Sequence, residues 1–158
     1  MNRIKAREIA VRCSYAQGFS RQSPEEFLET SVNRETFQRW EEEDSLYQDY
    51  PDEGNLAYIR EVVLGVAAHG PELDQYIARY ARNWTFDRIP RTAAAIMRVS
   101  MYEILYMDDI SAAASINAAV DIAKKYEDEK VVSFVNGILG SFVRAEFPET
   151  GEKPAGED

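Results

Sequence analysis

The basic side chains near the N-terminus are the first candidates for contact with a ligand. Arg3, Lys5, Arg7 and Arg12 fall within one predicted helix and would give it a basic patch. Such side chains commonly bind the phosphates of a nucleic acid. A helix face that only keeps a protein soluble has the same composition, so charge alone leaves both interpretations open.

The second candidate group lies in Phe134-Val135-Asn136-Gly137, which Lys130 precedes by one helical turn. Exposed aromatic rings flanked by Lys or Arg hold single-stranded RNA by stacking on its bases. The alternative is that Phe134 belongs to the hydrophobic core, and residue type alone favours the core. Asn136 and Gly137 are weak helix formers. Their place inside a helix predicts that another helix approaches closely there, with the Asn amide bonded to a backbone group.

Side chains that could support catalysis are few and isolated. His69 is the single histidine, which excludes the usual multi-histidine metal sites, and its place before Gly70-Pro71 indicates an interaction with a helix end. Cys13 is predicted to be a small buried thiol, because no partner base accompanies it. The acidic run 41–44 is typical of a solvated segment. We therefore expect no enzyme activity, no metal and no cofactor.

Length and composition limit the class of protein. The chain has 158 residues, 45% of them hydrophobic, which suffices for one cooperative core built in two lobes. No apolar run approaches the roughly 20 residues that span a bilayer, and the N-terminus lacks the apolar stretch of a signal peptide. With a single cysteine, the sequence predicts a cytoplasmic protein that has no membrane partner.

The net charge of −10 is unevenly distributed. Residues 1–21 contain five basic and one acidic side chains, whereas residues 22–61 contain three basic and twelve acidic ones. The first helix is therefore locally positive, and the overall charge does not exclude RNA as a ligand. It does predict weak nonspecific affinity, because long-range attraction to phosphates depends on the local field.

Apolar residues recur at three- and four-residue spacing along most of the chain, which predicts an all-α fold of two packed helical lobes. About seven helices are expected: residues 3–17, one beginning at Ser23-Pro24 and reaching Phe37, 56–68, one carrying Leu73 to Tyr80, 92–106, 111–125 and 129–145. In the first helix, Ile4, Ile9 and Tyr15 should lie broadly on the apolar side. Residues 41–54 are predicted to be an exposed loop. A single domain over 1–146, with lobes 1–70 and 71–146, would precede a disordered acidic tail over 147–158.

Several collinear motifs together resemble one family. They are Ala6-Arg7-Glu8, Asp87-Arg88-Ile89, Ala95-Ile96-Met97-Arg98, Tyr102-Glu103, Asp108-Asp109-Ile110, Ile116-Asn117, Ala123-Lys124-Lys125-Tyr126 and Phe134-Val135-Asn136-Gly137. The pattern resembles the NusB transcription antitermination factors from about residue 3 to 145. The resemblance implies a noncatalytic protein that binds boxA-type single-stranded RNA together with a small-subunit ribosomal protein acting as NusE. With other Nus factors it would act on the RNA polymerase elongation complex and promote read-through, chiefly in ribosomal RNA operons.

The resemblance also implies site residues. The family's RNA surface corresponds to Arg3, Lys5, Arg7 and Phe134, and Lys130 stands where the family commonly has an acid, which should favour phosphate. The family's protein-partner surface corresponds to Tyr15 and the region from Asp87 to Glu103, including Tyr102.

Departures from the family pattern concern the partner contact most directly. Ala93 and Ala94 stand where members usually have an acid and a base, and that acid faces the protein partner, so the contact is expected to be weaker or rearranged. An acidic insertion around 38–54 is longer than typical and has no assigned role. Some relatives are similar to dimers that cover the RNA surface, so the sequence leaves a homodimer open.

Two other functions are compatible with the sequence. One is a protein-interaction adaptor that has lost RNA binding, as the net negative charge suggests. The other is the RNA-binding domain of a ribosomal RNA cytosine methyltransferase, whose N-terminal portion resembles this family. A catalytic domain would then have to follow residue 158.

Overall fold

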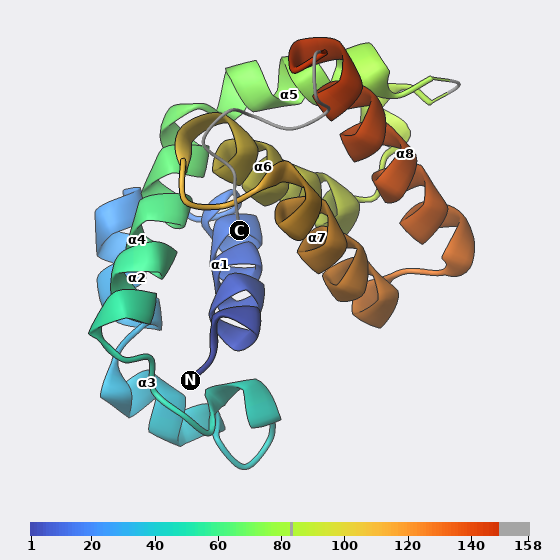
Figure 1. Cartoon of the computed structure of the whole chain (residues 1–158). Coiled ribbons are helices and arrows are strands. Elements are labelled where there is room, and N and C mark those ends of the chain that lie inside the picture. Colours follow the sequence, from blue (N-terminus) through green and yellow to red (C-terminus); the bar gives the residue numbers. More distant parts are fainter. Residues whose placement is uncertain (83, 149–158) are drawn as a thin grey trace. The chain divides into compact units, whose positions relative to one another are not determined.

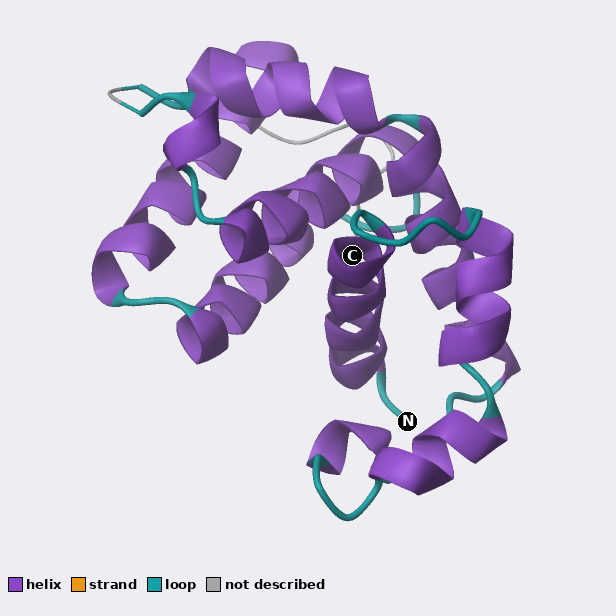
Figure 2. Ribbon diagram, turned by 180° about the vertical axis from the view of Figure 1, so that it is seen from behind, coloured by secondary structure: helices purple, strands orange, loops and turns teal. Residues whose placement is uncertain are grey.

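The computed structural model describes residues 1–82 and 84–148. The chain divides into two compact units, one formed by Met1–Ala68 and a second that begins at His69. Figure 2 shows helices joined by short loops, and no strand occurs among the described residues. The all-α prediction is confirmed. The predicted tail falls mostly on residues 149–158, outside the described residues.

The first unit contains four α-helices and a short 3-10 helix (Figure 1). They are α1 (Arg3–Gln17), α2 (Pro24–Ser31), α3 (Arg34–Trp40), η1 (Ser45–Tyr47) and α4 (Glu53–Ala68). Helix α1 packs along α4, and α2 packs against both. The buried side chains of α1 and α4 include Ala6, Ile9, Ala10, Ile59, Val62 and Val63. The small alanines on α1 let the two helices approach closely.

The apolar side of α1 differs in part from the prediction. Ile9 is 1% exposed, but Ile4 is 68% and Tyr15 39% exposed. Helix α1 therefore buries a narrow stripe of small and β-branched residues. Ile4 and Tyr15 lie outside that stripe, so the prediction that they share the apolar side with Ile9 is wrong.

The second predicted helix is two helices, which raises the predicted seven to eight within the described residues. Its start is as expected: Ser23 and Glu26 form a capping box, with Pro24 in the first turn. The helix ends at Ser31 because Asn33 begins α3: its side chain accepts a hydrogen bond from the Thr36 amide at 2.8 Å. Its Nδ2 atom also donates to the Glu29 carbonyl at 2.8 Å. Asn competes in this way with the helical backbone and favours caps.

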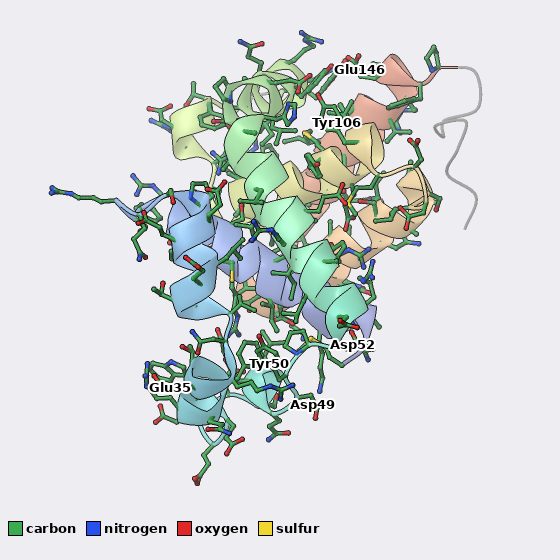
Figure 3. All side chains as sticks on the ribbon, turned by 90° about the vertical axis from the view of Figure 1, so that its left-hand side faces the viewer. Glu35, Asp49, Tyr50, Asp52, Tyr106 and Glu146 are labelled. Carbon is green, nitrogen blue, oxygen red and sulfur yellow. The ribbon has the colours of Figure 1, made fainter. Side chains whose placement is uncertain are left out.

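The acidic segment after α3 is partly folded, although we predicted an exposed loop. Leu46 in η1 is 5% exposed, and Phe37 meets the edges of the Tyr47 and Tyr50 rings at 4.8 and 5.2 Å between centroids. The hydroxyl of Tyr50, marked in Figure 3, donates to the Val32 carbonyl at 3.4 Å. These aromatic contacts fix a segment whose sequence is dominated by charge.

The second unit consists of α5 (Gly70–Tyr80), the 3-10 helix η2 (Phe86–Arg88), α6 (Arg91–Tyr106), α7 (Ala112–Tyr126) and α8 (Glu129–Glu146). Helix α6 contacts α5, α7 and α8 and is central to this unit. Its fully buried side chains include Ile96, Met97, Met101 and Ile104, which join Leu73, Ile77, Leu139 and Phe142. Tyr80 donates to Glu146, marked in Figure 3, at 2.5 Å and so ties α5 to the end of α8.

Candidate nucleic-acid interface

The first turns of α1 carry cations where helix electrostatics favours anions. Arg3, Lys5 and Arg7 fall within the first five helical residues, and the first turn contains no acidic side chain. Asn2 caps the helix by accepting from the Lys5 amide at 2.9 Å. The partial positive charge of a helix N-terminus disfavours cations. It favours a phosphate, which the cations would also attract.

Arg3 and Arg7 both lie over the ring of Tyr58 in α4. Their guanidinium carbons are 4.3 and 5.7 Å from its centroid, and Tyr58 is 3% exposed. Asn55, one turn earlier in α4, accepts a hydrogen bond from Arg3 Nε at 2.8 Å and donates to the Met1 carbonyl at 2.8 Å. Helix α4 thus holds two of the predicted RNA-binding cations at one end of the first unit.

Arg12 does not belong to this group. Its Nη1 atom lies 2.5 Å from Asp44 Oδ2, and its Nη2 atom lies 3.7 Å from Glu8 Oε2. Asp44 also caps η1 by accepting from the Leu46 amide at 3.0 Å. The acidic insertion therefore has at least one structural role, which is to neutralise the last arginine of α1.

In the second unit, Phe134 packs against Trp84. Their ring centroids are 4.5 Å apart, with a 42° angle between the planes, and both side chains are half-buried. Lys130, one turn before Phe134 on α8, places Nζ 5.7 Å from the centre of the Trp84 ring. The structure therefore joins the two predicted residues of this unit and adds a third. Sequence reasoning missed Trp84, although an indole three residues before Asp87-Arg88 was a signal for a site.

Asn136 and Gly137 do not meet a neighbouring helix, and that prediction is wrong. Both are exposed, and a Cβ atom added to Gly137 would meet nothing within 4 Å. Asn136 and Asn117 of α7 both line an open groove of about 700 Å³. The remaining lining residues are Val120, Asp121, Lys124, Glu127, Glu129, Val132 and Ser133. With three carboxylates and one lysine, the groove does not favour phosphate.

The residues predicted to meet a protein partner differ in exposure. Tyr15 is 39% exposed and meets the edge of Phe19, itself 57% exposed, at 5.3 Å between centroids. Asp87 is exposed in η2. Tyr102 is 8% exposed, and Glu103 has no exposed surface. Only Tyr15 and Asp87 of the four therefore offer a surface for a direct contact.

Glu103 takes part in a buried hydrogen-bond network between α6 and α7. Ser115 Oγ lies 2.7 Å from Glu103 Oε1 and 2.8 Å from Ser100 Oγ. This arrangement satisfies a carboxylate that would otherwise be costly to bury. Ala93 and Ala94, at the positions where the family pattern has charges, are also buried.

Cys13 is buried, as predicted. Burial raises the pKa of its thiol to about 12, so the nucleophilic thiolate is scarce at neutral pH. Over the described ranges, no three His, Cys, Asp or Glu side chains come together as a metal site would require. None of the described helices has the length and apolar character to traverse a bilayer.

Comparisons with known proteins agree on one family. The family model described as the NusB family matches residues 4–144. The transcription antitermination protein NusB of Thermoanaerobacter sp. (strain X514) is 38% identical over 152 residues, which cover 96% of this chain and 97% of the relative. The protein of the same name from Clostridium perfringens (strain SM101 / Type A) is 36% identical over 139 residues, or 88% of this chain and 94% of the relative.

Two solved structures share the fold. The structure of T. maritima NusB (P3121, Form 2) superposes with a TM-score of 0.73 at 24% identity, covering 90% of each chain. A chain from the crystal structure of antitermination factors NusB and NusE in complex with double-stranded RNA gives a TM-score of 0.71 at 23% identity, covering 90% of this chain and 96% of that one.

Proposed function

Because this chain belongs to the NusB family, we propose that it is a noncatalytic transcription antitermination factor. It binds boxA-type single-stranded RNA together with the small-subunit ribosomal protein that acts as NusE. Through other Nus factors it joins the RNA polymerase elongation complex in the cytoplasm and promotes read-through, chiefly in ribosomal RNA operons.

The observation that carries this proposal is the position of Arg3 and Arg7 on the Tyr58 ring. Together with Lys5, they concentrate positive charge at a helix N-terminus, in a chain whose net charge is −10. A phosphate bound there gains from both the side chains and the helix dipole. In the second unit, Phe134 and Lys130 offer a separate contact for RNA, a ring for base stacking with a cation beside it.

Tyr15 and Asp87 are the proposed contacts for NusE. The exposed rings of Tyr15 and Phe19 offer apolar surface with a polar hydroxyl, a combination enriched at protein interfaces. Tyr102 and Glu103 act indirectly by holding α6 in place, because both side chains are buried.

Binding of a labelled boxA-type RNA, measured by fluorescence anisotropy with and without NusE, tests the proposal. We expect Arg7→Glu to weaken RNA binding at least about tenfold and to reduce the slope of log K against log salt by about 1. Arg21→Glu is the matched control, since it makes the same charge change at an exposed site beyond the other end of α1. Affinity that depends on neither RNA sequence nor NusE would disprove the proposal.

The alternative of an adaptor without RNA binding is favoured by the negative charge and by the pairing of Arg12 with Asp44. RNA binding at low salt, where nonspecific affinity for RNA is greatest, distinguishes the two functions. A protein that binds NusE but shifts no RNA under those conditions would be the adaptor.

A further inference from the structure

We propose that Trp84 contacts RNA directly and that its indole and the Phe134 ring together form the stacking surface for one unpaired base. The inference deepens the proposed function and rests on it. It adds a residue to the RNA surface and gives Lys130 a defined task, which is to bind the phosphate next to the stacked base.

The position of Phe134 on α8 separates it from the core. The buried face of α8 is formed by Val131, Val135, Ile138, Leu139 and Phe142, each 7% exposed or less. Phe134 lies at the edge of that face and is half-buried. Trp84 covers one side of it, at 4.5 Å between ring centroids. Both rings therefore keep part of their surface in solvent while each fixes the orientation of the other.

The planes of the two rings meet at 42°, so the rings form a wedge and do not stack in parallel. A flat base gains about 1–3 kcal/mol from stacking on an aromatic side chain, whatever its identity. An aromatic pair in this arrangement offers a base two adjoining surfaces, which a single ring on a helix does not.

Lys130 completes the chemistry of this surface. Its ammonium lies 5.7 Å from the Trp84 ring centre, within the range of a cation–π contact. The contact keeps the cation beside the rings until RNA arrives. The lysine side chain is long and exposed, so it can turn from the ring face to a phosphate while the base takes its place.

The two tryptophans of the chain make a direct test possible. Trp40 ends α3 in the first unit and is 44% exposed, so Trp40→Phe leaves Trp84 as the single indole emitter without altering the surface formed by Trp84 and Phe134. Titration with boxA-type RNA should quench this emission along the same curve as the anisotropy change. Trp84→Phe, which leaves Trp40 as emitter, should show no quenching. RNA binding without any change in Trp84 emission would overturn the inference.

Affinity measurements with a second ligand separate base stacking from a structural role. Trp84→Leu should weaken boxA-type RNA about tenfold, whereas Trp84→Phe should stay within about threefold of the wild type. An abasic strand of the same length keeps the phosphates but offers no base, so its affinity should be equal for Trp84→Leu and wild type. If Trp84→Leu weakens both ligands equally, Trp84 is structural and the inference fails.

Trp40→Leu is the matched control for loss of an indole, and circular dichroism checks that each variant is folded. The inference and the proposed function fail in different ways. Wild-type protein that binds neither RNA would refute the proposed function. Wild-type protein that binds boxA-type RNA no better than Trp84→Leu does would refute only the role of Trp84.

Discussion

The carboxylate of Asp44 lies 2.5 Å from the guanidinium of Arg12 and connects the acidic segment to α1 across 32 positions of the sequence. Each side chain is 33% exposed, and Arg12 also approaches Glu8, whose side chain is 5% exposed. Partial burial and two acidic partners make this pair more significant than an ion pair in open solvent. These two ion pairs indicate that Arg12 stabilises the first unit.

A double-mutant cycle on Arg12→Ala and Asp44→Ala tests this assignment. We expect a coupling free energy of about 1 kcal/mol in urea unfolding. The exposed pair Arg39–Glu35, at 59% and 86% exposure, should give less than about 0.5 kcal/mol. Arg12→Ala should leave boxA-type RNA affinity within about twofold. If Arg12→Ala reduced RNA affinity as much as Arg7→Glu does, Arg12 would belong to the RNA surface instead.

Glu103→Ala should destabilise the protein by about 2–4 kcal/mol, because it removes a buried side chain and with it the carboxylate that accepts from Ser115 Oγ at 2.7 Å. Glu103→Gln keeps an oxygen in the same place and should cost less. Urea unfolding measures both, and NusE affinity of the folded variants provides the second readout. If Glu103→Gln kept full stability but lost NusE affinity tenfold, Glu103 would contact the partner directly.

Gly137→Ala should stabilise α8 by about 0.5–1 kcal/mol, since the site is exposed, helical and open to an added methyl group. Gly140→Ala should gain less, because Arg144 Nη1 would lie 3.1 Å from the new Cβ atom and must shift. Thermal unfolding compares the two. A loss of stability on Gly137→Ala would mean that another helix does approach Gly137.

The Cys13 thiol gives a pH-dependent prediction. Its folded-state pKa is about 12, raised from 9.0 by burial, so folding favours the neutral thiol. The contribution of the thiol to the free energy of unfolding is complete below pH 9 and falls as the pH rises from 9 towards 12. At about pH 10.5 the wild type should have lost about 2 kcal/mol more than Cys13→Ala. Equal alkaline losses in the two proteins would contradict the assignment.

A labelling experiment tests the same burial at neutral pH. Iodoacetamide should leave Cys13 unmodified in the folded protein and react fully in urea, as mass spectrometry would show. Rapid alkylation of the folded protein would mean that the thiol is accessible.

Local signals in the sequence predicted most helix boundaries. Helix α1 spans residues 3–17 as expected, α7 is shifted by one residue at both ends, and α8 extends one residue beyond the predicted end. Caps and breaks act over a few residues, so their effect is visible without the fold. Asn33 shows the limit of this approach. The apolar spacing runs on from α2 into α3 and predicted one helix, whereas the Asn33 side chain caps a second helix by accepting from the Thr36 amide.

Contacts between distant residues were not predictable in the same way. Trp84 reaches Phe134 across 50 positions, and Tyr58 lies beneath two arginines from another helix. Glu103 was predicted to lie on the partner surface because the family resemblance implied it, whereas the structure buries it beside Ser115, which donates to its carboxylate. Such pairings depend on tertiary packing, which residue types and spacing do not encode locally.

The Tyr58 ring has a thermodynamic consequence for ligand binding. Immobilising a long side chain at an interface costs about 0.5–1.5 kcal/mol of conformational entropy. Arg3 and Arg7 lose part of that freedom when the first unit folds, since a ring fixed in α4 already limits their rotamers. A phosphate then meets a preorganised pair of cations. A side chain that is 3% exposed thereby helps to determine affinity for a ligand it need never touch.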